Sequence, residues 1–346
     1  MVFDVVLFGL DLLTFYFMYA MLSLSLNLEF GYTGLPNFAK VLFYAGGAFV
    51  AGSLGARLGG WLLGISNAGP ADFGVVSIVN GAFANNPVLA LEYFLIIVVI
   101  AVAIGAALGF LVTFPALRLR EDYLGITLIV SGELLRVFVR VYEPIIGGAH
   151  GTPLPDPFAW AEGYLFRIGT FIALLATSTL VLYVMCERIG FSPYGRMLRS
   201  IRDNEEAAQA LGKDQLRAKR SVLMIGSAMA AYVGALYAFY TLYVNDAAFQ
   251  PIVTFVVWLM VILGGAGNNR GVLAGALIYL FIDKVVDQVK QYIPLQISSS
   301  YFGYIILGVV LLVILLYRPN GLFPERPITN LLVRGKKRPP IEKKQT

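Results

Sequence analysis

Charged residues are scarce in this 346-residue sequence, because Asp, Glu, Lys and Arg make up 14% of it, against about 25% in soluble domains. Hydrophobic residues make up 58%, and the mean hydropathy is +0.75. The sequence has one cysteine, Cys186, and one histidine, His150, which excludes a disulfide framework and a Cys/His metal site. The composition therefore predicts an all-α polytopic membrane protein that holds no metal.

Motifs for nucleotide hydrolysis and catalysis are also missing. Gly212-Lys213 is followed by Asp214, and the stretch GGAGNNRG does not end in Lys-Ser/Thr, so neither matches the Walker A loop. His150 has no Ser or Cys in a recognisable arrangement beside it and is typical of a loop residue. We expect a chain that is not an enzyme and needs no cofactor of its own.

Basic residues are absent before Lys40, so the N-terminus has no basic region of a cleaved signal peptide, and its first apolar run is expected to stay as a membrane helix. The net charge is +5 and the pI is about 9.1. This excess lies beside apolar runs and in the tail at 334–344, which favours anchoring at a membrane surface over binding of nucleic acid.

Long apolar runs recur along the whole chain. A spanning helix needs about 20 such residues, and this rule predicts about nine spans, the weaker of which are alternatively half-helices. The runs are Val5 to Leu28, Lys40 to Ala56, Val88 to Phe114, Tyr123 to Val141, Leu165 to Met185, Val222 to Val244, Ile252 to Leu263, Val272 to Val289 and Tyr301 to Tyr317. They form one transmembrane domain over 1–330, followed by a basic cytoplasmic tail at 331–346.

The charged loops alternate with nearly uncharged ones, which predicts the orientation. Basic residues fill the loops at 118–120, 187–220 and 270 and the tail, so these are expected in the cytoplasm. The N-terminus and the loops at 59–87 and 142–163 have few Lys or Arg and are expected outside.

One polar segment, Gly195 to Arg220, stands out between the apolar runs. Asp203 is expected to cap a helix from Asn204 to Leu211, with Glu206 at its third position and Gly212 as its stop. Within this helix the small or apolar residues at 207, 208 and 211 share one side. Such a narrow apolar face needs a partner, either the rest of this protein or a second protein.

Two glycine-rich stretches, Gly31 to Gly47 and Gly264 to Gly275, interrupt apolar runs and predict broken spans, because unwound backbone inside a membrane must be buried or line a cavity. Tyr32 and Tyr44 flank the first break and are expected to line a path. A third segment, Ser66 to Asn86, is equally compatible with a surface-lying or re-entrant helix and with an ordinary external loop.

Several charged residues lie inside the predicted spans, where each needs a partner or water. Glu133 and Arg136 are one helical turn apart, as are Lys284 and Asp287, and we favour pairing within each helix over a direct role in substrate binding. Lys40 is expected to reach the membrane surface or to meet Glu29.

Five stretches, in order, are similar to the permease subunits of branched-chain amino acid ABC importers, and the resemblance covers nearly the whole length. They are LSLNLEFGYTGLPNF, LRLREDYLGITLIVSGELLR, GRMLRSIRDNEEAAQALG, ILGGAGNNRGVLAGAL and YRPNGLF. The sequence departs from the family pattern at Lys40, Pro36 and Asn37 and around 67–86.

The resemblance implies a subunit in the cell membrane that forms a translocation path with a second permease. An extracytoplasmic binding protein would deliver the substrate, and two ATPase subunits would bind ATP and dock on a coupling helix. The matching coupling residues are Asp203, Glu205, Glu206, Ala207, Ala208, Leu211 and Gly212. The candidate path residues are Tyr32, Thr33, Gly34, Asn37, Tyr44, Gly264 and Gly265.

Other substrates and classes stay open at this point. Related permeases carry urea, short amides, nucleosides or sugars, and the sequence does not separate them. A stand-alone ion-coupled transporter or channel would bind coupling ions at a broken helix and would need no partner for the polar segment. A membrane enzyme is disfavoured because the acidic cluster that its chemistry requires is missing from the sequence.

Overall fold

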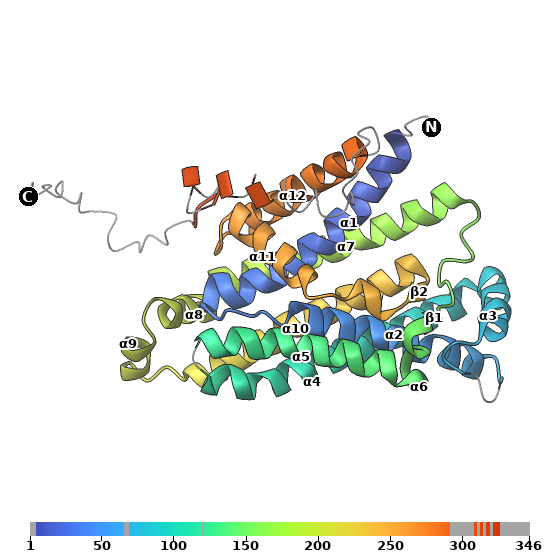
Figure 1. The fold of residues 1–346 in the computed structure, drawn as a ribbon, viewed down its shortest axis with the longest axis horizontal. Helices are drawn as coiled ribbons and strands as arrows, with labels where there is room; N and C mark the ends of the chain where they lie inside the picture. Colours follow the sequence, from blue (N-terminus) through green and yellow to red (C-terminus); the bar gives the residue numbers. More distant parts are fainter. Residues whose placement is uncertain are drawn as a thin grey trace, which may run out of the picture.

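The computed structural model describes residues 5–65, 69–119, 121–290, 308–309, 312–313, 316–318 and 321–325. Its long helices run side by side in one bundle, with short helices gathered at the two ends (Figure 1). The long helices are α1 (Val5–Leu26), α2 (Lys40–Leu62), α4 (Pro87–Arg118), α5 (Glu121–Val141), α7 (Tyr164–Phe191), α10 (Gln215–Thr241), α11 (Ile252–Gly264) and α12 (Asn269–Lys290).

The shorter elements lie at the ends of the bundle. At one end, α8 (Pro193–Asp203) and α9 (Glu205–Ala210) connect α7 to α10 (Figure 1). The opposite end carries α3 (Phe73–Asn85), α6 (Glu143–Ile146) and the strands β1 (Thr152–Pro153) and β2 (Tyr243–Val244), which pair antiparallel with Thr152 opposite Val244. The helical turns are η1 (Asn27–Gly31, π-helical), η2 (Gly148–His150) and η3 (Asp246–Ala248).

Six helical segments among the described residues are long and apolar enough to cross a membrane. They are Val6–Gly31, Lys40–Leu62, Pro87–Ala116, Tyr164–Phe191, Gln215–Thr241 and Asp246–Gly264. These segments confirm an all-α membrane protein. The expected spans at 123–141 and 272–289 are helices, α5 and α12, that carry more charge. The expected span at 301–317 lies mostly outside the described residues, so the total of nine stays a prediction.

Helices α2 and α10 form the most buried part of the bundle and pack against each other and against α4. Small residues let their backbones approach closely. A Cβ atom at Gly47 of α2 would clash with the carbonyl oxygen of Ala231, and one at Gly234 of α10 would clash with the carbonyl oxygen of Tyr44. Larger side chains at these two glycines would therefore push α2 and α10 apart.

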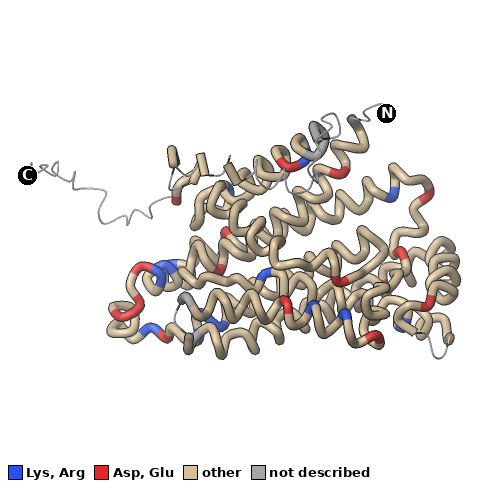
Figure 2. The backbone as a smooth tube through the Cα atoms, viewed as in Figure 1, with Lys and Arg blue, Asp and Glu red and all other residues tan. Residues whose placement is uncertain are grey.

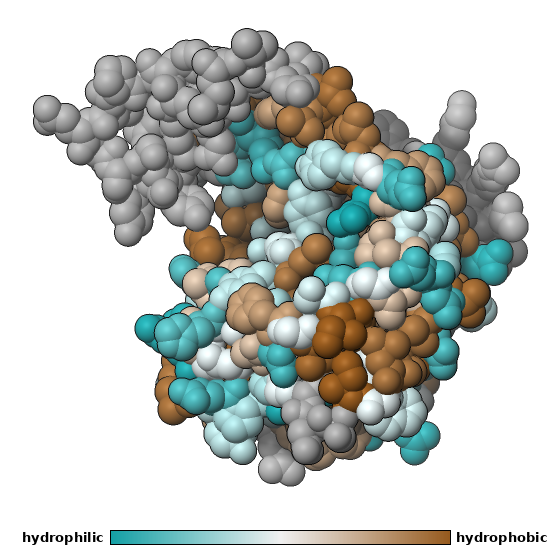
Figure 3. Space-filling model, turned by 90° about the vertical axis from the view of Figure 1, so that its right-hand side faces the viewer, coloured by the Kyte–Doolittle hydropathy of each residue, from teal (hydrophilic) through white to brown (hydrophobic). Residues whose placement is uncertain are grey.

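The open question about Ser66 to Asn86 is resolved by α3, a helix that packs on α2 and α4. Asp72 caps it by accepting a hydrogen bond from the Val75 N–H at 3.1 Å. The end of the molecule that carries α3 shows hydrophilic residues around apolar patches (Figure 3). Most charged residues lie toward the two ends, and a smaller number lie along the middle of the bundle (Figure 2).

Candidate functional site: α8, α9 and the two breaks

Helix α8 folds back against one end of the bundle. Ser192 caps it by accepting from the Gly195 N–H at 3.1 Å, and Pro193 stands in the first turn, where a missing N–H costs nothing. Leu198 and Ile201 are fully buried and join an apolar cluster with residues of α1, α7 and α10. Because its apolar face is packed, α8 is a firm support for the short α9 that follows it.

The cap of α9 differs from the expected one. Asn204, and not Asp203, accepts the hydrogen bond from the Ala207 N–H at 2.9 Å, so the helix runs Glu205–Ala210. Asp203 still belongs to α8 and pairs with Arg202 at 3.2 Å. Glu206 is therefore at the second helical position and does not complete a capping box. The stop at Gly212 is confirmed, since its φ of +75° is left-handed and its N–H donates to the Gln209 carbonyl.

The small residues of α9 do not share one environment. Ala208 is 3% exposed and packs into the same apolar cluster as α8, whereas Ala207 is exposed and Leu211 is 78% exposed. The expected common face is thus wrong, because the side chain at 208 contacts this protein's own core. Glu205 is tied back to α10 through Lys219. The side of α9 with Glu206, Ala207 and Leu211 is exposed.

Two arginines of α8 meet Glu325, which lies 126 positions after the first of them, Arg199. Arg199 Nε lies 2.8 Å from Glu325 Oε1, and Arg202 Nη2 lies 2.9 Å from Glu325 Oε2. Burial alone would lower the pKa of Arg202, but its ion pair with Glu325 outweighs burial and raises the pKa above its usual value. The ion pairs of both arginines with Glu325 hold the 321–325 segment on α8.

Arg202 also reaches the first predicted break, which lies between η1 and α2. Its Nη1 donates to the carbonyl oxygen of Gly31, the last residue of η1. Gly34 has a φ of +72°, and a Cβ there would lie 2.9 Å from Cγ of Arg202. The chain is not helical from Gly34 to Ala39 and becomes helical again at Lys40. The first break is therefore real, starts at its left-handed glycine and contacts α8 directly.

The break is held from inside by a buried ion pair. Lys40 Nζ lies 2.6 Å from Glu29 Oε2, and the two side chains are 1% and 0% exposed. Asn37 Nδ2 donates to the same carboxylate at 2.9 Å, and Lys40 Nζ donates to Ser25 Oγ at 3.1 Å. The prediction that Lys40 meets Glu29 is confirmed. A buried pair with added hydrogen bonds fixes geometry, and breaking it by removing one partner costs about 3–5 kcal/mol.

The second break joins α11 to α12 and packs against the first. Asn27 of η1 donates from Nδ2 to Asn269 Oδ1 at 2.8 Å and accepts from the Gly267 N–H at 2.8 Å. The segment at 321–325 covers the same turn, because the N–H groups of 322 and 323 donate to the carbonyls of 263 and 264 at 2.9 and 3.0 Å. The two breaks and α8 thus form one connected unit.

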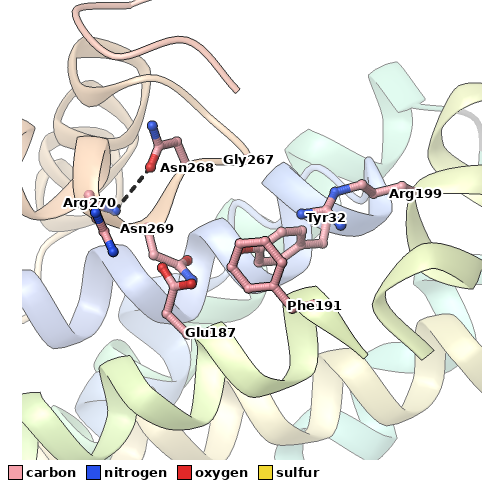
Figure 4. Close-up of a pocket in the computed structure, with 8 residues that line it drawn as sticks. All are labelled: Tyr32, Glu187, Phe191, Arg199, Gly267, Asn268, Asn269 and Arg270. Carbon is pink, nitrogen blue, oxygen red and sulfur yellow. Dashed lines mark hydrogen bonds between the residues drawn. The ribbon is translucent and has the colours of Figure 1, made fainter. Parts of the chain in front are cut away.

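A small pocket opens at this junction (Figure 4). Tyr32 forms its inner wall, with the guanidinium of Arg199 over the ring at 4.7 Å from the centroid. Glu187 and Phe191 come from the end of α7, and the opposite wall is Gly267 to Arg270 at the start of α12. Asn269 is 1% exposed and its Nδ2 has no hydrogen-bond partner.

The candidate path residues lie in the interior rather than along an open channel. Tyr32, Thr33, Asn37 and Tyr44 are all at most 6% exposed. Tyr44 packs against the rings of Tyr237 and Phe249 at centroid distances of 5.6 and 5.2 Å. Gly264 ends α11 and Gly265 turns the chain toward α12. The structure brings Tyr32, Thr33 and Gly34 together beside α8, while Tyr44 lies further along α2.

Two charged pairs inside the bundle were also predicted. Glu133 and Arg136 pair within α5 as expected. Lys284 meets the carboxylate of Asp11 on α1, since α1 and α12 pack side by side. The side chain of Asp287 lies outside the described residues, so its pairing with Lys284 stays a prediction. Within the described residues, no group of three or more His, Cys, Asp or Glu side chains is placed to hold a metal ion.

Comparison with known proteins agrees with this arrangement. Residues 9–315 match the family described as branched-chain amino acid transport system / permease component. The chain belongs to this family. The permease is 34% identical to a probable branched-chain amino acid transport permease protein LivM of Methanocaldococcus jannaschii, over 96% of both chains.

More distant relatives of the permease come in two kinds. It is 26% identical to the high-affinity branched-chain amino acid transport system permease protein LivM of Escherichia coli, over 91% of this chain and 69% of that one. It is 23% identical to LivH of the same organism, over 88% and 90%. Similarity to both supports a permease of a multi-subunit importer that contains a second permease. No solved structure matches the chain.

Several residues of this junction were not predicted. Asn27, Asn269 and Glu325 are distant in sequence and follow no periodicity that would join them. The only available signal was that Asn27 and Asn269 are polar residues within or beside apolar runs, where each amide needs a partner. Glu325 is an acid in a basic stretch and carries no such signal.

Proposed function

We propose that this permease is one transmembrane subunit of an ATP-driven importer for branched-chain or closely related amino acids. The family and its relatives support the substrate class. The observation that carries the mechanism is the position of α9, which has an exposed side and directly follows α8. Helix α8 is bonded to Gly31 beside the first break and to Glu325 of the segment that covers the second. A loop helix that faces only solvent would not be tied to the rest of the chain by these bonds.

The partners follow from this surface. Two ATPase subunits bind and hydrolyse ATP, and one of them receives the side of α9 with Glu206, Ala207 and Leu211. Asp203, Glu205, Ala208 and Gly212 shape and hold that surface rather than touch the ATPase. A second permease completes the membrane part, and the chain itself needs no cofactor.

The mechanism uses the bonds between α8 and the breaks. When the ATPase subunits close on ATP, they displace α9, and the packed α8 moves with it. Arg202 and Arg199 carry this displacement to Gly31, Gly34 and the turn at Gly264 and Gly265. The buried side chains at 32, 33, 37 and 44 belong to the gate that opens as this turn shifts.

We propose that α8 and α9 lie in the cytoplasm, because the basic residues cluster at that end. The N-terminus and the end with α3, β1 and β2 then lie outside, where the binding protein delivers the amino acid. The polar and apolar mixture of that end suits a docking surface (Figure 3).

The test is reconstitution of the permease with its co-purifying subunits in liposomes. Leucine uptake is expected to need ATP and the binding protein and to persist when ion gradients are collapsed. Uptake that follows an ion gradient and ignores ATP would contradict the proposal and support the ion-coupled alternative. A complex that hydrolyses ATP only with urea, a nucleoside or a sugar would change the substrate class alone.

A further inference from the structure

Three charged side chains meet on the exposed side of α5. Arg136 donates from Nε to Glu133 Oε2 at 2.9 Å and from Nη1 to Asp246 Oδ2 of η3 at 3.0 Å. The side chains of Arg136, Glu133 and Asp246 are 17%, 37% and 8% exposed. Two carboxylates share one guanidinium, so this network has a formal charge of −1.

The network lies part-way along the length of the bundle, away from its two ends. Helix α5 starts beside the end of α4, runs along α2 and α4, and ends at α6 beside the outer elements. It therefore crosses the same layer as the apolar α4. Glu133 is about 18 Å along α5 from its first residue, at the rise of about 1.5 Å per residue, and so falls within the hydrocarbon thickness of about 30 Å.

Lipid is an unsuitable neighbour for these groups. An ionised side chain inside the hydrocarbon layer costs several kcal/mol unless water or protein solvates it. Yet Glu133 is more than one-third exposed, and Arg140, about two turns further on the same side, is also exposed. The neighbouring stripe of α5 is exposed and apolar, with Leu134 64% and Val130 47% exposed. The charged side of α5 therefore borders water within the assembly, and the apolar stripe borders lipid or protein.

The chemistry of the network matches one end of an amino acid. A zwitterion in a membrane path must exchange the water around its ammonium and carboxylate groups for protein groups. Glu133 offers an exposed carboxylate. If this carboxylate turns to a ligand, Arg136 remains paired with Asp246. A ligand carboxylate, by contrast, would find the guanidinium of Arg136 already paired with Glu133 and Asp246.

We infer that Glu133, positioned by Arg136 and Asp246, receives the ammonium group of the amino acid as it passes along α5. This inference rests on the proposed function, because it assumes an amino acid as the cargo. It adds a recognition site to a part of the chain that the glycine breaks do not touch.

The first experiment tests whether water reaches the site. In a Cys186→Ala background, which removes the single cysteine, Glu133→Cys and Leu134→Cys are compared in the reconstituted complex. A charged thiol reagent that does not cross membranes is expected to label Glu133→Cys and to spare Leu134→Cys. An unlabelled Glu133→Cys, both with and without ATP, overturns the inference.

The second experiment separates recognition from a purely structural tie. Glu133→Gln keeps an acceptor for Arg136 but removes the charge, so the assembly and its ATPase activity are expected to stay intact. Leucine uptake at saturating binding protein is expected to fall about 10- to 100-fold, the range for losing a charged hydrogen bond. Unchanged uptake, or a loss matched by an equal loss of assembled complex, contradicts the inference.

Controls keep the two proposals distinct. Asp214 caps α10 and pairs through an exposed carboxylate with Arg217. Asp214→Asn removes this charge and is expected to leave uptake unchanged. If the unmodified complex takes up no leucine with ATP, the proposed function fails. If it does, and the Glu133 variants behave like the Asp214 control, only the recognition site fails.

Discussion

At the residue scale, Lys40 and Glu29 decide whether the first break keeps its shape. Both side chains are fully buried, and Oε1 of Glu29 has no hydrogen-bond partner. A Cβ at Gly226 would clash with that same oxygen, so α10 packs directly on the carboxylate. The pair has no room for a larger neighbour or for a change of partner without movement of the surrounding helices.

The variant Lys40→Met is therefore expected to lower the stability of the permease by about 3–5 kcal/mol, because it leaves Glu29 buried without its cation. Thermal unfolding in detergent, followed by tryptophan fluorescence, measures the change. The double variant Glu29→Leu/Lys40→Met is expected to recover most of the loss. The control Arg217→Met breaks an exposed pair with Asp214 and is expected to cost about 0–1 kcal/mol. A Lys40→Met protein as stable as the unmodified one would show that the pair adds nothing.

At the element scale, α9 depends on one amide for its start. We expect Asn204→Ala to destabilise this short helix by about 1 kcal/mol and to speed amide exchange in α9 about fivefold. Hydrogen exchange with mass spectrometry measures this. Asp203→Ala is the matched control, since Asp203 is exposed and caps nothing. Faster exchange in the control than in Asn204→Ala would mean that the cap is misassigned.

The two alanines of α9 are expected to respond differently to the same substitution. Ala207→Trp adds bulk to the exposed side and is expected to abolish uptake while the complex still hydrolyses ATP. Ala208→Trp overpacks the core and is expected to destabilise the chain by about 1–3 kcal/mol. ATP-dependent uptake and thermal unfolding are measured for both. Normal uptake by Ala207→Trp would exclude this side of α9 as the docking surface.

The limits of α9 were predictable to about one residue, and the reason its cap was not is physical. Both Asp203 and Asn204 are good caps, and the choice depends on where α8 stops, which the burial of its own Leu198 and Ile201 decides. Likewise, helical spacing put 207, 208 and 211 on one side, but only the position of α8 determines which of them is covered.

At the scale of the whole molecule, the helical class and six of the spans were predictable from apolar runs. The gathering of basic residues at the end with α8 and α9 was predictable from the loop charges. The site was predictable only where a short stretch carries the signal, as in the two breaks and the pair Lys40–Glu29. Contacts such as Asn27 with Asn269 or Arg199 with Glu325 join distant segments, and no local pattern reports them.

The orientation has a direct test across the two ends. In a Cys186→Ala background, an impermeant maleimide added to intact cells is expected to label Ala84→Cys, at the end of α3, and to leave Gln209→Cys on α9 unlabelled. Both positions are exposed in the structure. Lysed cells are expected to label both. The reverse pattern in intact cells would mean that the permease has the opposite orientation and that α9 is not the docking surface of the ATPase.

The contact between Glu325 and α8 also bears on how the protein is made. Ribosomes synthesise the chain from its N-terminus, so Arg199 and Arg202 are made well before their acidic partner Glu325. Until then α8 lacks its last anchor, and the turn at 263 and 264 lacks the backbone partners of 322 and 323. The support of the proposed docking surface on α9 is thus complete only after residues 321–325 have been synthesised.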